Sequence, residues 1–107
     1  MNYHDHKQCI DACLQCAAAC NHCASSCLQE EDPEMMVRCI QLDMECAVIC
    51  EAAARLMSLG SDKVKEICRL CAEICERCAT ECEQHENEHC RECAELCRAC
   101  AEKCKTM

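Results

Sequence analysis

The cysteines between residues 9 and 27 constrain the fold of this chain more than any other feature. They are separated by steps of 4, 3, 4, 3 and 4 residues. Residues three and four apart are stacked neighbours on one face of an α-helix, so the segment predicts a helix with a stripe of thiols. In an ordinary bundle helix such a stripe carries Leu, Ile or Val. Here sulfur replaces hydrocarbon on the face that should point to a core.

The same period recurs in three later segments, so all of the cysteines fall on helical stripes. Residues 68–82 and 90–104 each step 3, 4, 3 and 4, and residues 39–50 carry a sparser stripe whose gap falls at Asp43. Four such stripes predict thiols that converge on one axis. The candidate metal ligands are, in chain order, Cys9, Cys13, Cys16, Cys20, Cys23, Cys27, Cys39, Cys46, Cys50, Cys68, Cys71, Cys75, Cys78, Cys82, Cys90, Cys93, Cys97, Cys100 and Cys104.

Turn and capping signals separate the four segments. Asp32 is a favourable N-cap with Pro33 at the first helical position, and Gly60 supplies a left-handed stop. Short connections between long helices favour antiparallel neighbours. We therefore predict an all-α fold, a single-domain antiparallel up-down-up-down four-helix bundle with a cysteine-lined core. The helices are expected at about 4–30, 34–59, 62–84 and 87–105, with Ser61 or Asp62 capping the third.

Composition supports a core built from cysteine. The chain has 107 residues, of which 19 are Cys, while Leu, Ile and Val together number 15. So few aliphatic residues would not bury enough surface to fold an ordinary domain. Buried free cysteine behaves as a small hydrophobe, so the thiols can supply the missing core.

Charge and terminal sequence bound the partners and the compartment. The formal net charge is -9, which disfavours nucleic acid and anionic membrane as partners. No apolar run is long enough for a membrane span, and Met1–Lys7 shows neither a signal core nor a twin arginine. We expect a cytoplasmic protein, whose thiols stay reduced and serve metal or redox chemistry. The odd number of cysteines also fits a complete disulfide framework poorly.

The choice of metal follows from ligand softness, geometry and charge. Thiolates select Cu(I), Zn(II) or iron–sulfur clusters. A straight ladder is expected to offer pairs and threes of thiols, which suits Cu(I), whereas structural zinc takes four ligands in a tetrahedron. About one Cu(I) per thiolate leaves the core neutral, but each buried tetrathiolate zinc site carries about two negative charges. Storage of many Cu(I) ions without catalysis is favoured; a Zn(II) or Cd(II) buffer and a thiol redox reservoir or sensor stay open.

Other candidate ligands interrupt or extend the stripes. His85 follows Cys82 by three residues and His89 adjoins Cys90, so both belong to one end of an antiparallel bundle, which we expect to admit metal. Asp43 points inward if its stripe is continuous. A buried carboxyl group needs a partner, which is a metal ion, a thiol proton or a basic residue.

The opposite end is expected to be closed. His6 extends the first stripe there, close to a terminus of the kind that frays. His4 and His22 are expected on the surface. An apolar plug is predicted from four residues near this end, Met57, Leu59, Val64 and Ile67.

The stripes at 9–27, 68–82 and 90–104, with the sparser Cys39, Cys46 and Cys50, resemble those of the bacterial copper storage proteins, in particular the cytosolic branch without an export signal. The resemblance covers nearly the whole chain. It implies a four-helix bundle that holds many Cu(I) ions inside and assembles as a tetramer. It also implies that all of the cysteines are copper ligands, that His85 and His89 assist at one end, and that Asp43 supplies an oxygen ligand.

Overall fold

Four helices account for most of the chain. The structure, a computed structural model, describes residues 3–107. A 3₁₀ turn, η1 (Tyr3–His6), leads into α1 (Lys7–Leu28), and a second, η2 (Pro33–Met36), leads into α2 (Val37–Ser58). Helices α3 (Val64–Cys82) and α4 (Glu88–Lys105) follow. The described residues contain no strand, and the predicted all-α bundle is confirmed.

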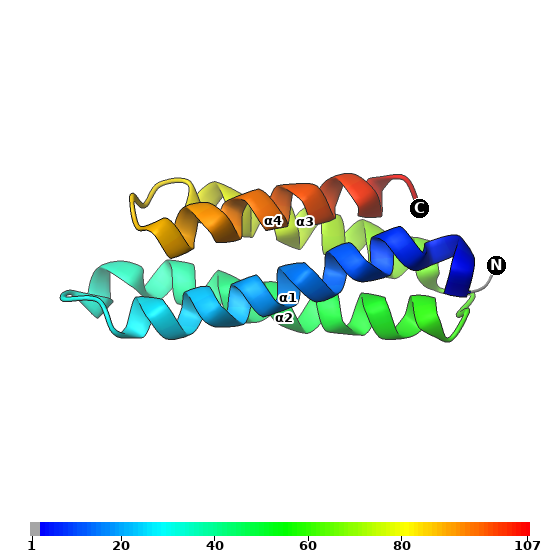
Figure 1. Cartoon of the computed structure of the whole chain (residues 1–107), viewed down its shortest axis with the longest axis horizontal. Coiled ribbons are helices and arrows are strands. Elements are labelled where there is room, and N and C mark those ends of the chain that lie inside the picture. The colour runs from blue at the N-terminus through cyan, green and yellow to red at the C-terminus, as the bar shows by residue number, and fades with distance from the viewer. Residues whose placement is uncertain (1–2) are drawn as a thin grey trace.

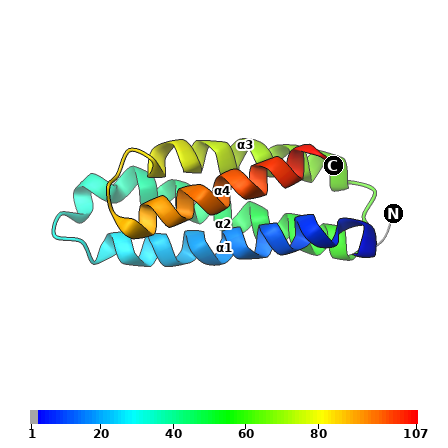
Figure 2. The same cartoon turned by 45° about the horizontal axis from the view of Figure 1, so that its top comes forward.

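The helices form an elongated antiparallel bundle of 47 × 18 × 18 Å. Helix α1 packs against α2 and α4, and α3 packs against the same two neighbours. The α1–α2 and α3–α4 connections lie at one end, and the α2–α3 connection lies at the other with both termini (Figure 1). A view turned by 45° shows the same up-down-up-down path (Figure 2). Every helix therefore presents one face to a common axis.

The observed helix boundaries depart slightly from the predicted ones. Gly60 has a φ of 68°, as predicted for a left-handed stop. Asp32 precedes η2, but its side chain makes no capping hydrogen bond; its backbone carbonyl accepts one from Met35 at 3.2 Å. The Ser61 hydroxyl accepts from the Lys63 backbone N–H at 3.0 Å, so α3 begins only at Val64. Tight 3₁₀ turns thus occupy helix starts that the sequence pattern assigned to the α-helices.

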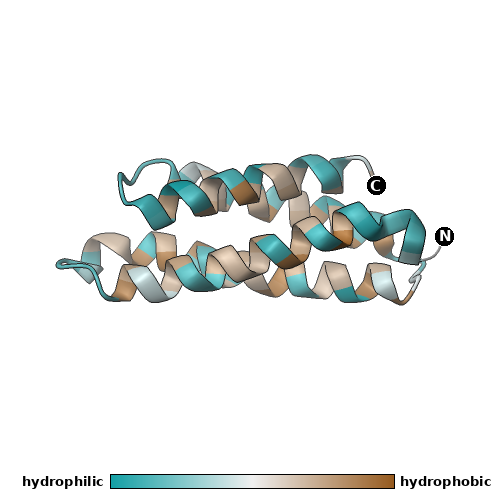
Figure 3. Ribbon diagram, in the orientation of Figure 1, coloured by the Kyte–Doolittle hydropathy of each residue, from teal (hydrophilic) through white to brown (hydrophobic). Residues whose placement is uncertain are grey.

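Cysteine forms the core, as predicted. All 19 cysteines are buried and free, and none exposes more than 3% of its surface. Buried alanines pack among the cysteines of the core, and hydrophilic residues alternate with apolar ones along the helices (Figure 3). No described helix combines the length and the apolar character that crossing a membrane requires.

Candidate metal centre

The buried thiols form a continuous column along the bundle axis. At the end that carries the termini, Cys9 Sγ lies 3.7 Å from Cys104 Sγ, which lies 3.8 Å from Cys13 Sγ. In the middle, Cys46 Sγ lies 3.6 Å from Cys75 and 3.8 Å from Cys16. Similar contacts of 3.6–4.0 Å link further thiols along the column. These separations are too long for disulfides and suit sulfur atoms that share metal ions.

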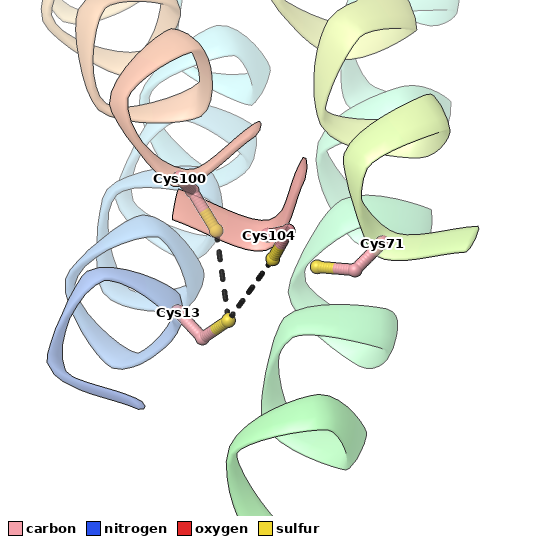
Figure 4. A group of neighbouring side chains, drawn as sticks. All are labelled: Cys13, Cys71, Cys100 and Cys104. Carbon is pink, nitrogen blue, oxygen red and sulfur yellow. Dashed lines mark hydrogen bonds between the residues drawn. The ribbon is translucent and has the colours of Figure 1, made fainter. Parts of the chain in front are cut away.

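Thiols from different helices converge in groups of four. Cys13, Cys71, Cys100 and Cys104 have Sγ atoms that all lie within 4.8 Å of one another, and Figure 4 shows them pointing to a common centre from α1, α3 and α4. This corrects the expectation of pairs and threes, because that expectation followed one helix at a time. Further groups share members: Cys16 and Cys46 belong both with Cys50 and Cys75 and with Cys20 and Cys97.

Asp43 lies inside the column and is fully buried. Three thiols donate to its Oδ1, from Cys78 at 3.2 Å, Cys93 at 3.4 Å and Cys82 at 3.6 Å. A fourth thiol, that of Cys39, lies 3.8 Å from Oδ2. The predicted inward orientation is therefore correct, and in the metal-free chain the partners of the carboxyl group are thiols.

Burial raises the pKa of two groups in this part of the column, Asp43 and Cys90. Loss of solvent, followed by repulsion from charge on Cys93 and Cys78, raises the pKa of Asp43 to about 10. Burial, followed by repulsion from charge on Cys39, likewise raises the pKa of the Cys90 thiol to about 12. At neutral pH both groups are therefore protonated in the metal-free chain. A cation that binds here must displace protons, and the charge inside the bundle then stays nearly constant.

His89 sits where the column meets one end of the bundle. Its Nε2 lies 2.9 Å from the Glu30 carboxylate. With the Nε2 proton donated to Glu30, the Nδ1 lone pair faces the thiols of Cys23 at 3.4 Å and Cys90 at 3.6 Å. The carboxylate therefore sets the tautomer and the orientation that a metal-binding imidazole needs.

His85 reaches the same end without touching the column. Helix α3 stops at Cys82, so the i, i+3 register used to extend its stripe does not apply beyond that residue. The His85 ring instead lies 2.9 Å from the Glu81 carboxylate. Its position at the rim agrees with the prediction, but its contact is with an acidic side chain rather than a thiol.

Of the four residues predicted to close the opposite end, three are buried or partly buried: Met57, Val64 and Ile67. The fourth, Leu59, is 72% exposed and closes nothing. Leu59 lies two residues beyond the buried Met57, so it faces away from the side of α2 that Met57 presents to the core. The structure also buries His6 at this end, where the sequence suggested a frayed terminus; His4 and His22 are exposed as predicted.

A helical bundle with many buried free thiols, one buried carboxyl group and an oriented imidazole at one end defines a class of protein, the helical bundles that bind soft metal ions in their core. The comparisons place the chain within that class. A family model described as copper storage protein matches residues 2–107. The chain belongs to the copper storage protein family.

Individual relatives agree with this assignment. The Cu(I)-bound copper storage protein BsCsp3 of Bacillus subtilis is 50% identical, with a TM-score of 0.91 over 94% of this chain and 95% of its own. A cytosolic copper storage protein from Streptomyces lividans, with five coppers, is 40% identical, with a TM-score of 0.91 over 94% and 89% of the two chains. The cysteine-rich protein YhjQ of Bacillus subtilis, itself described as uncharacterized, is 50% identical over 81 residues, 76% of this chain and 75% of that protein.

Proposed function

We propose that this chain stores Cu(I) ions inside the bundle, with thiolates of the core as ligands and no catalytic role. The observation that carries the proposal is the continuous column of buried, free thiols with Sγ separations of 3.6–4.0 Å. Membership of the copper storage protein family and the copper bound by its relatives support it. The cytosolic description of the Streptomyces protein supports a cytoplasmic location.

Sharing of thiols between groups favours Cu(I) over Zn(II). The four-thiol groups do make tetrahedral zinc sites geometrically possible, so zinc is the strongest rival. However, Cys16, Cys20, Cys46 and Cys97 each belong to two groups, and separate zinc sites cannot all use them. Thiolates that bridge two Cu(I) ions use every group at once. One Cu(I) replacing one thiol proton also adds no net charge to the core.

Metal capacity should therefore separate copper from zinc. We expect anaerobic titration against a competing chelator to saturate at about one Cu(I) per thiolate, about nineteen in all, and at about four Zn(II) ions. Ellman's reagent should react with most thiols of the empty chain and with few in the copper-filled chain. A zinc endpoint equal to that of copper would favour a zinc buffer, and loss of thiols to disulfides without metal uptake would favour a redox reservoir.

We propose His85, His89 and Asp43 as the non-thiol residues of the metal pathway, with His89 receiving copper at the rim. A double replacement, His85→Ala with His89→Phe, should slow loading and removal several-fold with total capacity nearly unchanged. The reason is that imidazole offers a neutral ligand between solvent and the column. Stopped-flow transfer from a Cu(I)–chelator complex measures this rate. Val64→Ser, which opens the opposite end, serves as the control: if it alters the rate and the double replacement does not, copper enters at the other end.

We propose a tetramer that buries apolar residues of α2. Val37, Met44 and Val48 are each more than half exposed, and their spacing of 7 and 4 residues puts them on one face of α2. Exposed apolar residues aligned in this way are typical of an interface. Val48→Glu should lower the mass measured by light scattering from that of four chains, whereas Leu70→Glu on α3 should not. An unchanged tetramer in Val48→Glu would place the interface elsewhere.

A further inference from the structure

His6 is the only side chain in the described part of the molecule with buried nitrogen or oxygen atoms that lack any hydrogen-bond partner. Its side chain is 1% exposed, and neither Nδ1 nor Nε2 contacts a donor or acceptor among the described residues. Buried polar groups are nearly always paired, so an exception calls for a specific reason. An imidazole without a partner has a free lone pair held in an apolar setting, as a ligand for a soft cation would be.

The position of His6 connects it to the thiol column. It immediately precedes α1 and lies three residues before Cys9, so it continues the buried stripe of that helix. Cys9 Sγ in turn lies 3.7 Å from Cys104 Sγ. The 3₁₀ turn η1, which ends at His6, packs on both α1 and α2 and holds the residue inside the bundle. The imidazole therefore follows the last pair of thiols at this end.

We propose that His6, with the thiolates of Cys9 and Cys104, forms a terminal Cu(I) site at the closed end of the column. At the other end an imidazole, that of His89, already lies beside the thiols of Cys23 and Cys90, whereas the His6 ring has no such contact in the metal-free chain. Binding displaces the protons of both Cys9 and Cys104 to solvent; one thiolate balances the charge of this copper and the other bridges to the next Cu(I) in the column, while the neutral imidazole donates a lone pair and copper stays Cu(I). A neutral last ligand completes the coordination of the outermost copper without adding a thiolate charge.

This inference rests on the proposed copper storage. Its test uses the parent protein, in which His6 is unchanged. In the chain labelled with ¹⁵N-histidine, anaerobic addition of Cu(I) should shift one ring nitrogen of His6 strongly before saturation. Signals are assigned by replacing the other four histidines one at a time, so His6 itself need not be altered. A His6 ring whose nitrogen signals do not move in a copper-filled chain overturns the site while storage stands. If the parent takes up no copper at all, the proposed function fails instead.

Variants add a second readout. His6→Leu should bind one Cu(I) fewer by native mass spectrometry, and His6→Met, which restores a soft ligand, should regain it. His22→Leu, on the exposed side of α1, should keep full capacity. Without metal, His6→Leu should melt at the same or a higher temperature than the parent, because it removes an unpaired buried polar group. A purely structural histidine predicts the reverse, a lower melting temperature with unchanged capacity.

Discussion

Metal-free protein is expected to lose about 1.4 kcal/mol of unfolding free energy for each unit of pH between about 5 and 8, and Asp43→Asn is expected to remove most of this slope. The folded chain holds the Asp43 proton up to a pKa of about 10, while the unfolded carboxyl group releases it near 3.8. The native state therefore binds more protons in this window. Stability from this group is complete below the unfolded pKa and falls as the pH rises.

The accumulated effect is large for a domain of this size. Over three pH units the loss amounts to about 4 kcal/mol, whereas the whole free energy of unfolding of a typical domain is about 5–15 kcal/mol. The asparagine side chain in Asp43→Asn would keep an oxygen acceptor for the surrounding thiols but carries no titratable proton. Urea melts with reductant and chelator at several pH values measure the slope. Glu51→Gln, on the exposed face of α2, is the matched control and should keep the parental slope. Equal slopes in the parent and in Asp43→Asn would show that the carboxyl group is ionised when buried.

Copper loading is expected to raise the melting temperature by at least about 16 °C. A ligand that binds only the folded chain raises the free energy of unfolding by about 4 kcal/mol per site when its concentration is a thousand times its Kd. Each kcal/mol raises the melting temperature of a small domain by about 4–8 °C. Because many sites fill together here, the effect of a single site is the smallest expected rise in melting temperature. The metal-free chain should already be helical by circular dichroism, because the helical period, the left-handed stop at Gly60 and the buried cysteine stripes specify the bundle without metal.

Calorimetry measures the melting temperature and far-ultraviolet circular dichroism measures the helical content, each with and without Cu(I). Zn(II) at the same ratio to thiol serves as the control and should raise the midpoint less, because it fills fewer sites. A metal-free chain that is disordered and becomes helical only with copper would contradict the preformed column. A loaded chain with an unchanged midpoint would mean that copper binds outside the folded core.

Periodicity predicted the fold because each helix buries a face whose residues recur at three and four positions. The stripes of α1, α3 and α4 needed only this rule, and the inward orientation of Asp43 followed from continuing the α2 stripe across its gap. The rule fails where a helix ends. Leu59 follows the end of α2 and is exposed, and His85 lies beyond α3 and contacts Glu81. The prediction for His85 extended a register that the chain had already left, whereas the prediction for Leu59 used only its nearness to the end of the bundle and ignored which side of α2 it faces.

Relations between helices were harder to predict. One helix shows only its own ladder of thiols, whereas the groups of four arise where α1, α2, α3 and α4 meet. The pairing of His89 with Glu30 joins residues 59 positions apart, and no local pattern signals it. The burial of His6 depends on η1, whose 3₁₀ turn folds the terminus onto α2. A signal was available in its spacing from Cys9, but the expectation of fraying outweighed it.

Anomalous diffraction from crystals of the copper-filled chain, recorded on both sides of the copper absorption edge, tests the central claim most directly. Storage in the core predicts a string of copper peaks along the bundle axis, each within bonding distance of two or three of the buried sulfurs, with all four helices intact. Peaks confined to the surface or to contacts between chains, or helices unwound around four-coordinate ions, would contradict it.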